Sequence, residues 1–127
     1  MSKFVLDASA LLALLNDEPG AELVQQSLPE ALVSAVNLAE VVTRLSLAGM
    51  PKDQIREALA LLGLEVKAFD DEQAFQSGLL ATRTQAYGLS LGDRACLVLA
   101  LTTDSTALTA DKVWQDLNVG AKVELIR

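Results

Sequence analysis

Short apolar runs alternate with longer helical stretches along this chain, and this alternation constrains the fold more than any other feature. The stretches between the runs repeat their apolar residues with a helical period. Strands that alternate with helices predict a parallel sheet with helices on both faces. We therefore expect a doubly wound α/β/α sandwich around a five-stranded, mostly parallel sheet. Its strands should be Phe4–Leu6, Ala31–Val33, Leu64–Ala68, Ala107–Thr109 and Val123–Ile126.

Glycine, proline and capping residues divide the remaining sequence into helices. Gly49 and Gly63 each follow a helical stretch, as C-terminal capping glycines do. The stretch that begins at Ser90 is apolar on every side, which predicts a buried helix. The expected helices are Ser9–Leu15, Ala21–Ser27, Asn37–Ala48, Pro51–Leu62, Asp70–Ala86, Ser90–Thr102 and Lys112–Leu117.

Length and composition narrow the class of protein. A chain of 127 residues suits one domain, residues 1–127. No apolar run is long enough to cross a membrane, and the first residues do not resemble a secretory signal. We therefore expect a cytoplasmic protein. The single cysteine, Cys96, lies in an apolar helix and is expected to be a core residue and not a nucleophile.

The absence of histidine excludes several kinds of chemistry. Without it the chain cannot build a Ser-His-Asp or Cys-His centre, and most zinc and haem sites are also excluded. Acid–base chemistry would have to use carboxylates, lysine, tyrosine or metal-bound water. The net charge of −7 argues against a protein that coats nucleic acid, although it does not exclude a nuclease.

The predicted fold places four acidic residues close together at one edge of the sheet. Asp7 and Asp111 each follow a strand, Glu40 begins the helix after the second strand, and Asp93 begins the helix before the fourth. In a parallel sheet the carboxyl ends of the strands face one edge, where ligands bind. An oxygen-only set of ligands suits Mg²⁺ or Mn²⁺. Asp104 should lie at the opposite edge, roughly 16 Å from Asp93 at about 1.5 Å of rise per residue.

Each acid alone also has a simpler interpretation as a helix cap. Asn37-Leu-Ala-Glu40 and Ser90-Leu-Gly-Asp93 both have the pattern of a capping box. Asp7 and Asp111 could cap the helices that they precede. Capping does not require all four to share one edge, so together they favour a metal site.

With these residues in place, the whole chain resembles a PIN domain of the short bacterial, VapC-like kind. The resemblance rests on four segments in the correct order. They are Phe4-Val-Leu-Asp7-Ala-Ser9, Asn37-Leu-Ala-Glu40-Val, Gly88-Leu-Ser-Leu-Gly-Asp93-Arg-Ala, and Leu108-Thr-Ala-Asp111-Lys-Val-Trp114.

The resemblance implies a divalent-metal-dependent endoribonuclease that is the toxin of a toxin–antitoxin pair. The family's acidic residues match Asp7, Glu40, Asp93 and Asp111, and its small polar residues match Ser9 and Thr109. The expected partners are an RNA substrate, a cognate antitoxin and a second copy of the chain. The stretches Ser9–Asn16 and Gln54–Leu62 are candidate contact surfaces for these proteins, although core packing explains them equally well.

Several roles remain open from the sequence. Glu40 could orient water, act as a base or be a plain ligand, and it could pair with Arg44 one turn later. Arg94 and Lys112 could contact phosphate, but a solvated charge is the simpler interpretation. Trp114 could stack on a base, but a core position is favoured.

Two other classes of protein compete with the nuclease. One is a receiver-type signalling domain, which usually carries an adjacent acidic pair after its first strand, where this chain has the lone Asp7. The other is a PIN-like interaction module without catalytic activity, against which the intact acidic set argues.

Overall fold

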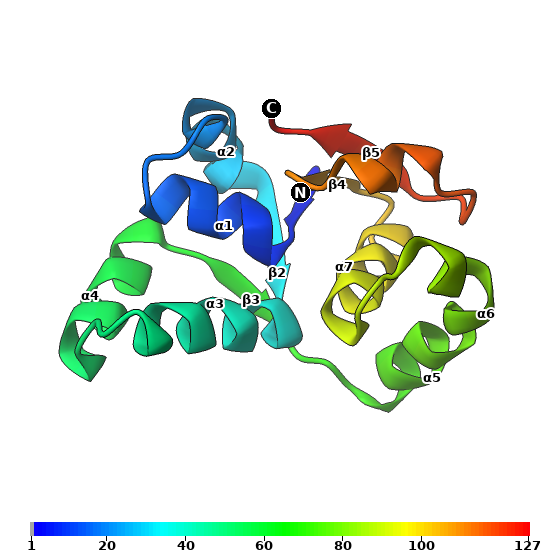
Figure 1. Cartoon of the computed structure of the whole chain (residues 1–127), viewed down its shortest axis with the longest axis horizontal. Coiled ribbons are helices and arrows are strands. Elements are labelled where there is room, and N and C mark those ends of the chain that lie inside the picture. Colours follow the sequence, from blue (N-terminus) through cyan, green and yellow to red (C-terminus); the bar gives the residue numbers. More distant parts are fainter. Residues whose placement is uncertain (1) are drawn as a thin grey trace.

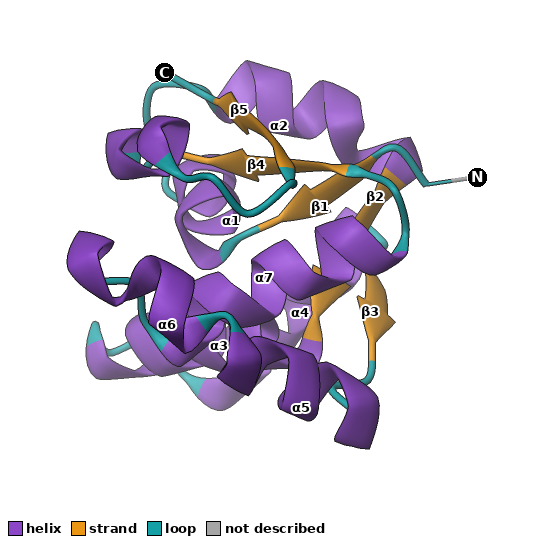
Figure 2. Cartoon of the chain, turned by 90° about the vertical axis from the view of Figure 1, so that its right-hand side faces the viewer, coloured by secondary structure: helices purple, strands orange, loops and turns teal. Residues whose placement is uncertain are grey.

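Five parallel strands form one sheet in the order β3-β2-β1-β4-β5. The computed structural model describes residues 2–127. All four strand pairings are parallel, which confirms the expected sheet. Figure 2 shows the twisted sheet between helices. Its strands are β1 (Phe4–Leu6), β2 (Ala31–Ser34), β3 (Glu65–Lys67), β4 (Thr106–Thr109) and β5 (Lys122–Leu125).

Helices cover both faces of this sheet (Figure 1). The α-helices of the described chain are α1 (Ala8–Leu15), α2 (Ala21–Ser27), α3 (Ala35–Leu47), α4 (Lys52–Leu62), α5 (Asp71–Leu79), α6 (Ala81–Thr84) and α7 (Leu91–Thr102). Three 3₁₀ turns accompany them: η1 (Leu28–Glu30), η2 (Gln85–Tyr87) and η3 (Lys112–Asp116). Helices α1 to α4 pack on one face, and α5 to α7 pack on the other with η3. None of these helices is both long and apolar enough to span a membrane within the described residues.

The central strand β1 shows why the chain needs two hydrophobic cores. Its side chains alternate between the faces of the sheet, as strand geometry requires. Leu6 enters the cluster with α1 and α3, whereas Val5 enters the cluster with α7. Trp114 and Cys96 are buried in this second cluster, so both expected core positions are confirmed.

The long helix expected over Asp70–Ala86 breaks at Leu80. The Arg83 N–H bonds back only three residues, to the Leu80 carbonyl, and the Thr84 hydroxyl donates to the same carbonyl at 2.9 Å. Such side-chain hydroxyls compete with the helical hydrogen bonds of the backbone. The segment therefore divides into α5, α6 and η2. The last expected helix is shorter and tighter than predicted, because Lys112–Asp116 is a 3₁₀ turn.

The expected start of another helix also needs correction: α3 begins at Ala35 and not at Asn37. Ser34 is the N-cap, and its hydroxyl oxygen accepts a hydrogen bond from the Val36 N–H at 3.2 Å. The capping box predicted for Asn37 and Glu40 is therefore wrong. Asn37 lies inside the helix, and its buried side chain is free for another contact.

The parallel strands place their carboxyl ends at one edge of the sheet. Asp7 follows β1 there, and its N–H continues the ladder to Leu108 of β4 at 3.2 Å. Asp104 precedes β4 and pairs with Lys122, the first residue of β5, at 3.2 Å. This places Asp104 at the opposite edge, as predicted.

Candidate metal-binding and nuclease site

Asp7 is the most buried acid at the carboxyl edge, with 4% of its surface exposed. It is the N-cap of α1, and its Oδ1 accepts a hydrogen bond from the Ala10 N–H at 2.8 Å. The Ser9 hydroxyl donates to the same oxygen at 2.7 Å, and the Thr109 hydroxyl donates to Oδ2 at 2.5 Å. A hydroxyl from the neighbouring strand thus fixes this carboxylate across the sheet.

Burial nevertheless raises the pKa of Asp7 from 3.8 to about 6. The hydrogen bonds from Thr109, Ser9 and Ala10 oppose this rise because they stabilise the charged form, and the nearby negative charge of Asp93 adds to it. A carboxyl group that is costly to ionise gains most from a cation beside it. Ser9 and Thr109 contact the carboxylate directly, and the Ser9 oxygen also accepts a hydrogen bond from the Ala110 N–H at 2.9 Å.

Asp93 and Asp111 are both fixed by helix-capping contacts. Ser90 and Asp93 form a reciprocal capping box at the start of α7, in which the Ser90 N–H donates to Asp93 Oδ2 at 2.9 Å and the Asp93 N–H donates to Ser90 Oγ at 3.2 Å. Asp111 is the N-cap of η3, and its Oδ1 accepts from the Val113 N–H at 3.1 Å. The capping interpretation is therefore correct for these acids, and it leaves their second oxygens available.

Glu40 lies in the second turn of α3 and is held by Asn37. The Asn37 amide donates from Nδ2 to Glu40 Oε1 at 2.9 Å and to the Gly92 carbonyl of α7 at 3.0 Å. Asn37 is 1% exposed, so these hydrogen bonds form away from water. Its Oδ1 is also buried and has no partner within the described chain. A buried acceptor without a partner costs about 1–3 kcal/mol.

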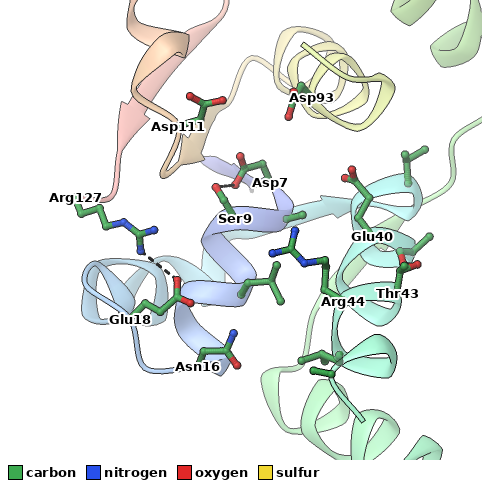
Figure 3. A pocket seen from close by; sticks show the side chains of 16 residues that line it. Asp7, Ser9, Asn16, Glu18, Glu40, Thr43, Arg44, Asp93, Asp111 and Arg127 are labelled. Atoms are coloured by element: carbon green, nitrogen blue, oxygen red, sulfur yellow. Dashed lines mark hydrogen bonds and ion pairs between the residues drawn. The ribbon is translucent and has the colours of Figure 1, made fainter. Parts of the chain in front are cut away.

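These four acids line a single cavity of about 820 Å³ at the carboxyl edge. Figure 3 shows Asp7 between Asp111, Asp93 and Glu40, with each acid carried by a different segment of the chain. Only Asp7 uses both oxygens in hydrogen bonds to the described residues; Glu40, Asp93 and Asp111 use one each. The predicted gathering of these acids at one edge is thus observed.

The donor set fits a hard divalent cation in kind, because every candidate ligand is a carboxylate oxygen. Within residues 2–127, however, no three acidic or cysteine side chains lie close enough together to hold one ion as they stand. A cation would have to draw carboxylates inward from the cavity wall. A shared set of four ligands therefore stays a prediction.

Basic residues at the cavity differ from the expected set. Arg44 lines the cavity and points from α3 towards Asp7 and Ser9, but no ion pair joins it to Glu40 in the described chain. Arg94 does not line the cavity; its guanidinium donates a hydrogen bond to the Ser77 carbonyl of α5 at 2.9 Å. Arg127 closes another part of the wall, where it pairs with Glu18 at 3.3 Å.

A comparison with family models gives a match to the PIN domain over residues 4–119. The chain belongs to the PIN domain family. None of the curated proteins matches its sequence. The family assignment accounts for the doubly wound sheet, and it replaces the receiver-domain interpretation.

Solved structures with this PIN fold include several toxin–antitoxin complexes. DNA-bound VapBC from Salmonella typhimurium superposes with a TM-score of 0.79 at 17% identity, covering 100% of both chains. VapBC2 from Rickettsia felis, bound to a promoter DNA fragment, gives 0.76 at 19% identity over 96% of this chain and 97% of that chain. VapBC-5 from Mycobacterium tuberculosis gives 0.62 at 24% identity over 100% of this chain and 99% of that chain. At these identities the likeness shows the fold.

The sequence analysis did not recognise Arg127 and Glu18, which line the PIN cavity, or the part played by Asn37, which contacts the cavity residue Glu40. Arg127 and Glu18 come from segments without a motif, and nothing in the sequence signals that they meet. The role of Asn37 had a signal that was interpreted differently. A polar residue between Val36 and Leu38, three positions before Glu40, fits a buried hydrogen-bond donor as well as a cap.

Proposed function

We propose that this PIN domain is a divalent-metal-dependent endoribonuclease and the toxin of a toxin–antitoxin pair. One observation carries the proposal. Asp7, Glu40, Asp93 and Asp111, which come from four separate segments, line one cavity that contains no histidine or cysteine. Family membership and the likeness to VapBC complexes support it.

Each acid has a distinct part in the proposed reaction. Mg²⁺ or Mn²⁺, when bound, would activate water and neutralise charge that develops on the phosphate. Asp7 would hold the cation from the floor of the cavity, where the Thr109 and Ser9 hydroxyls keep its carboxylate oriented. Asp93 and Asp111 would contribute the oxygens that their capping contacts leave available.

Glu40 and Arg44 occupy the wall of the cavity on α3. Glu40 would bind the cation or position the attacking water through the oxygen that Asn37 does not contact. Arg44 extends over the same space without an ion pair in the described chain, so its guanidinium is placed to bind a phosphate oxygen. The positive charge of Arg44 offsets part of the repulsion between the acidic cavity and a polyanionic RNA substrate.

Cleavage of RNA by a matched pair of variants tests the proposal. Asp93→Asn keeps the shape of the capping side chain but removes its negative charge, so we expect cleavage in Mg²⁺ or Mn²⁺ to fall by roughly 100-fold or more. The measurement is the initial rate on a pool of end-labelled oligoribonucleotides, with EDTA as the metal-free control.

Asp104→Asn is the control variant, because Asp104 follows α7 but lies at the other edge of the sheet. It should cleave like the unchanged protein. Equal rates for Asp93→Asn and the unchanged protein, or undiminished cleavage in EDTA, would remove the acidic cavity from the mechanism. Absence of cleavage in every preparation would favour the second candidate, a PIN-like interaction module without activity.

The proposed toxin role requires partners. An apolar cavity of about 440 Å³ lies between α3 and α4, lined by Leu38, Val42, Ser46, Lys52, Ile55, Arg56 and Leu59. It includes Ile55, Arg56 and Leu59 from the stretch 54–62 predicted as a contact surface, whereas Ser9 and Leu12 of α1 line the acidic cavity. We propose that a cognate antitoxin covers these surfaces and that the chain forms a homodimer in the cytoplasm. Size-exclusion chromatography with light scattering tests the dimer.

A further inference from the structure

The carboxylate of Glu40 lies against two buried parts of neighbouring turns. One is the buried amide of Asn37 on the preceding turn of α3, and the other is the backbone of Gly92 in the first turn of α7. Asp93 is the next residue after Gly92, so the contact brings two candidate metal ligands together from different helices. Figure 3 shows Glu40 and Asp93 facing the same space.

The orientation of the Asn37 amide follows from its partners. Glu40 Oε1 and the Gly92 carbonyl oxygen are both acceptors, so the NH₂ group must face them and the amide oxygen must face away. That oxygen is buried without a partner. An apolar residue would suit this position better if packing were its only role. The donor side of the amide is therefore what the position uses.

Gly92 is needed for a different reason. A Cβ built at this position would overlap the Glu40 carboxyl group, including its Cδ and both of its oxygens. Its backbone is helical and does not require glycine. The missing side chain thus makes room for the carboxylate of another helix, and any larger residue would push Glu40 from its place.

We propose that Asn37 and Gly92 are positioning residues that hold the Glu40 carboxylate against the start of α7, beside Asp93, in the orientation needed to bind a divalent cation. The inference rests on the proposed metal-dependent function and adds the source of its geometry. Asn37 fixes one carboxylate oxygen, which leaves the other directed to the cavity. Because Gly92 has no side chain, Glu40 of α3 can approach the start of α7, where Asp93 lies.

Mn²⁺ affinity, measured by electron paramagnetic resonance on the full chain, tests this inference without relying on cleavage. We expect Asn37→Ala and Gly92→Ala each to weaken Mn²⁺ binding by about 10-fold or more, as loss of a residue that orients a ligand usually does. Gly78→Ala is the matched control, because it also adds a methyl group to a helix but has open space around it. Its Mn²⁺ affinity should be unchanged.

A double-mutant comparison shows whether both residues act through Glu40. In a Glu40→Ala background, Asn37→Ala and Gly92→Ala should no longer change Mn²⁺ affinity, because the carboxylate that they position is absent. An undiminished effect there, or unchanged affinity in both single variants, would overturn the inference. If Asn37→Ala unfolds, Gly92→Ala still decides the matter.

Hydrogen exchange of the Asn37 side-chain amide provides a readout that needs no metal. Its protons should be protected in the unchanged protein and should exchange faster in Glu40→Ala. Mn²⁺ binding without any change in the variants would contradict only the positioning role. Absence of both Mn²⁺ binding and RNA cleavage in the unchanged protein would contradict the proposed function, while exchange would still report whether the contact forms.

Discussion

At the scale of single residues, Asp7 combines structural and chemical demands that conflict in the metal-free protein. Its carboxylate accepts hydrogen bonds from Ser9, Ala10 and Thr109, all of which favour the charged form. Burial has the larger effect and raises the pKa to about 6. The sequence placed Asp7 just after one predicted strand and Thr109 at the end of another, but it could not give this balance, which depends on how completely the surrounding helices exclude water.

The raised pKa of Asp7 predicts a pH dependence of stability in EDTA. The folded state holds the proton more tightly than the unfolded state, so this group stabilises the fold below about pH 4. Its contribution is lost as the pH rises through about 6. The difference between the pKa of Asp7 in the unfolded and in the folded state corresponds to roughly 3 kcal/mol of unfolding free energy.

Urea unfolding of the unchanged protein and of Asp7→Asn, at intervals from pH 4 to pH 8, measures this contribution. We expect the variant to gain stability relative to the unchanged protein across that range. A constant difference between the two proteins would show that Asp7 ionises normally.

At the scale of elements, the start of α7 was predictable because its signals are local. Ser90 and Asp93 lie three positions apart and form the expected capping box. The same pattern at Asn37 was misleading, because Ser34 is a competing cap three residues earlier and α3 extends to it. An N-cap residue has an extended backbone. The sequence pattern alone does not reveal which of the two candidate caps, Ser34 or Asn37, has that conformation. The break at Leu80 was equally hidden, since it arises from threonine hydroxyls that also occur within regular helices.

Loss of the α7 cap is expected to affect both stability and metal binding. Ser90→Ala removes the hydroxyl that accepts the Asp93 N–H, which should lower the unfolding free energy by about 1 kcal/mol. It should also lower Mn²⁺ affinity, because the first turn of α7 carries Asp93. The measurements are urea unfolding and Mn²⁺ titration.

Asp70→Ala is the comparison for this prediction. Asp70 caps α5 through the Gln73 N–H at 2.9 Å, away from the acidic cavity. It should lose similar stability but retain the Mn²⁺ affinity of the unchanged protein. If both variants bind Mn²⁺ equally well, the cap supports only the helix.

At the scale of the whole molecule, the alternating pattern was sufficient to predict the sheet and the edge where the acids gather. It succeeds because parallel strands impose one direction on every connection. It could not predict that the carboxylates would stop short of ligand spacing, or that Arg127 would line the same cavity. Those features depend on side-chain rotamers and on contacts between segments distant in the sequence.

Divalent metal should stabilise the whole domain if the cavity binds it. A ligand at 100 times its dissociation constant stabilises the folded state by about 2.7 kcal/mol. For a chain of this size that corresponds to a rise of roughly 10 °C in melting temperature. Differential scanning calorimetry with Mg²⁺ or Mn²⁺ measures the effect.

NaCl at equal ionic strength controls for general screening of the net charge of −7. The double variant Asp7→Asn, Asp93→Asn should show only the screening effect. Equal shifts with NaCl and with Mn²⁺ in the unchanged protein would contradict a specific site.

The position of β4 beside β1 has a consequence for synthesis in the cell. These strands are adjacent in the sheet, yet about a hundred residues separate them along the chain. A polypeptide released prematurely after α7 lacks both Asp111 and the Thr109 hydroxyl that orients Asp7. Under the proposed mechanism, truncated translation products would therefore lack nuclease activity, because the last acid arrives only after nearly all the other elements have been made.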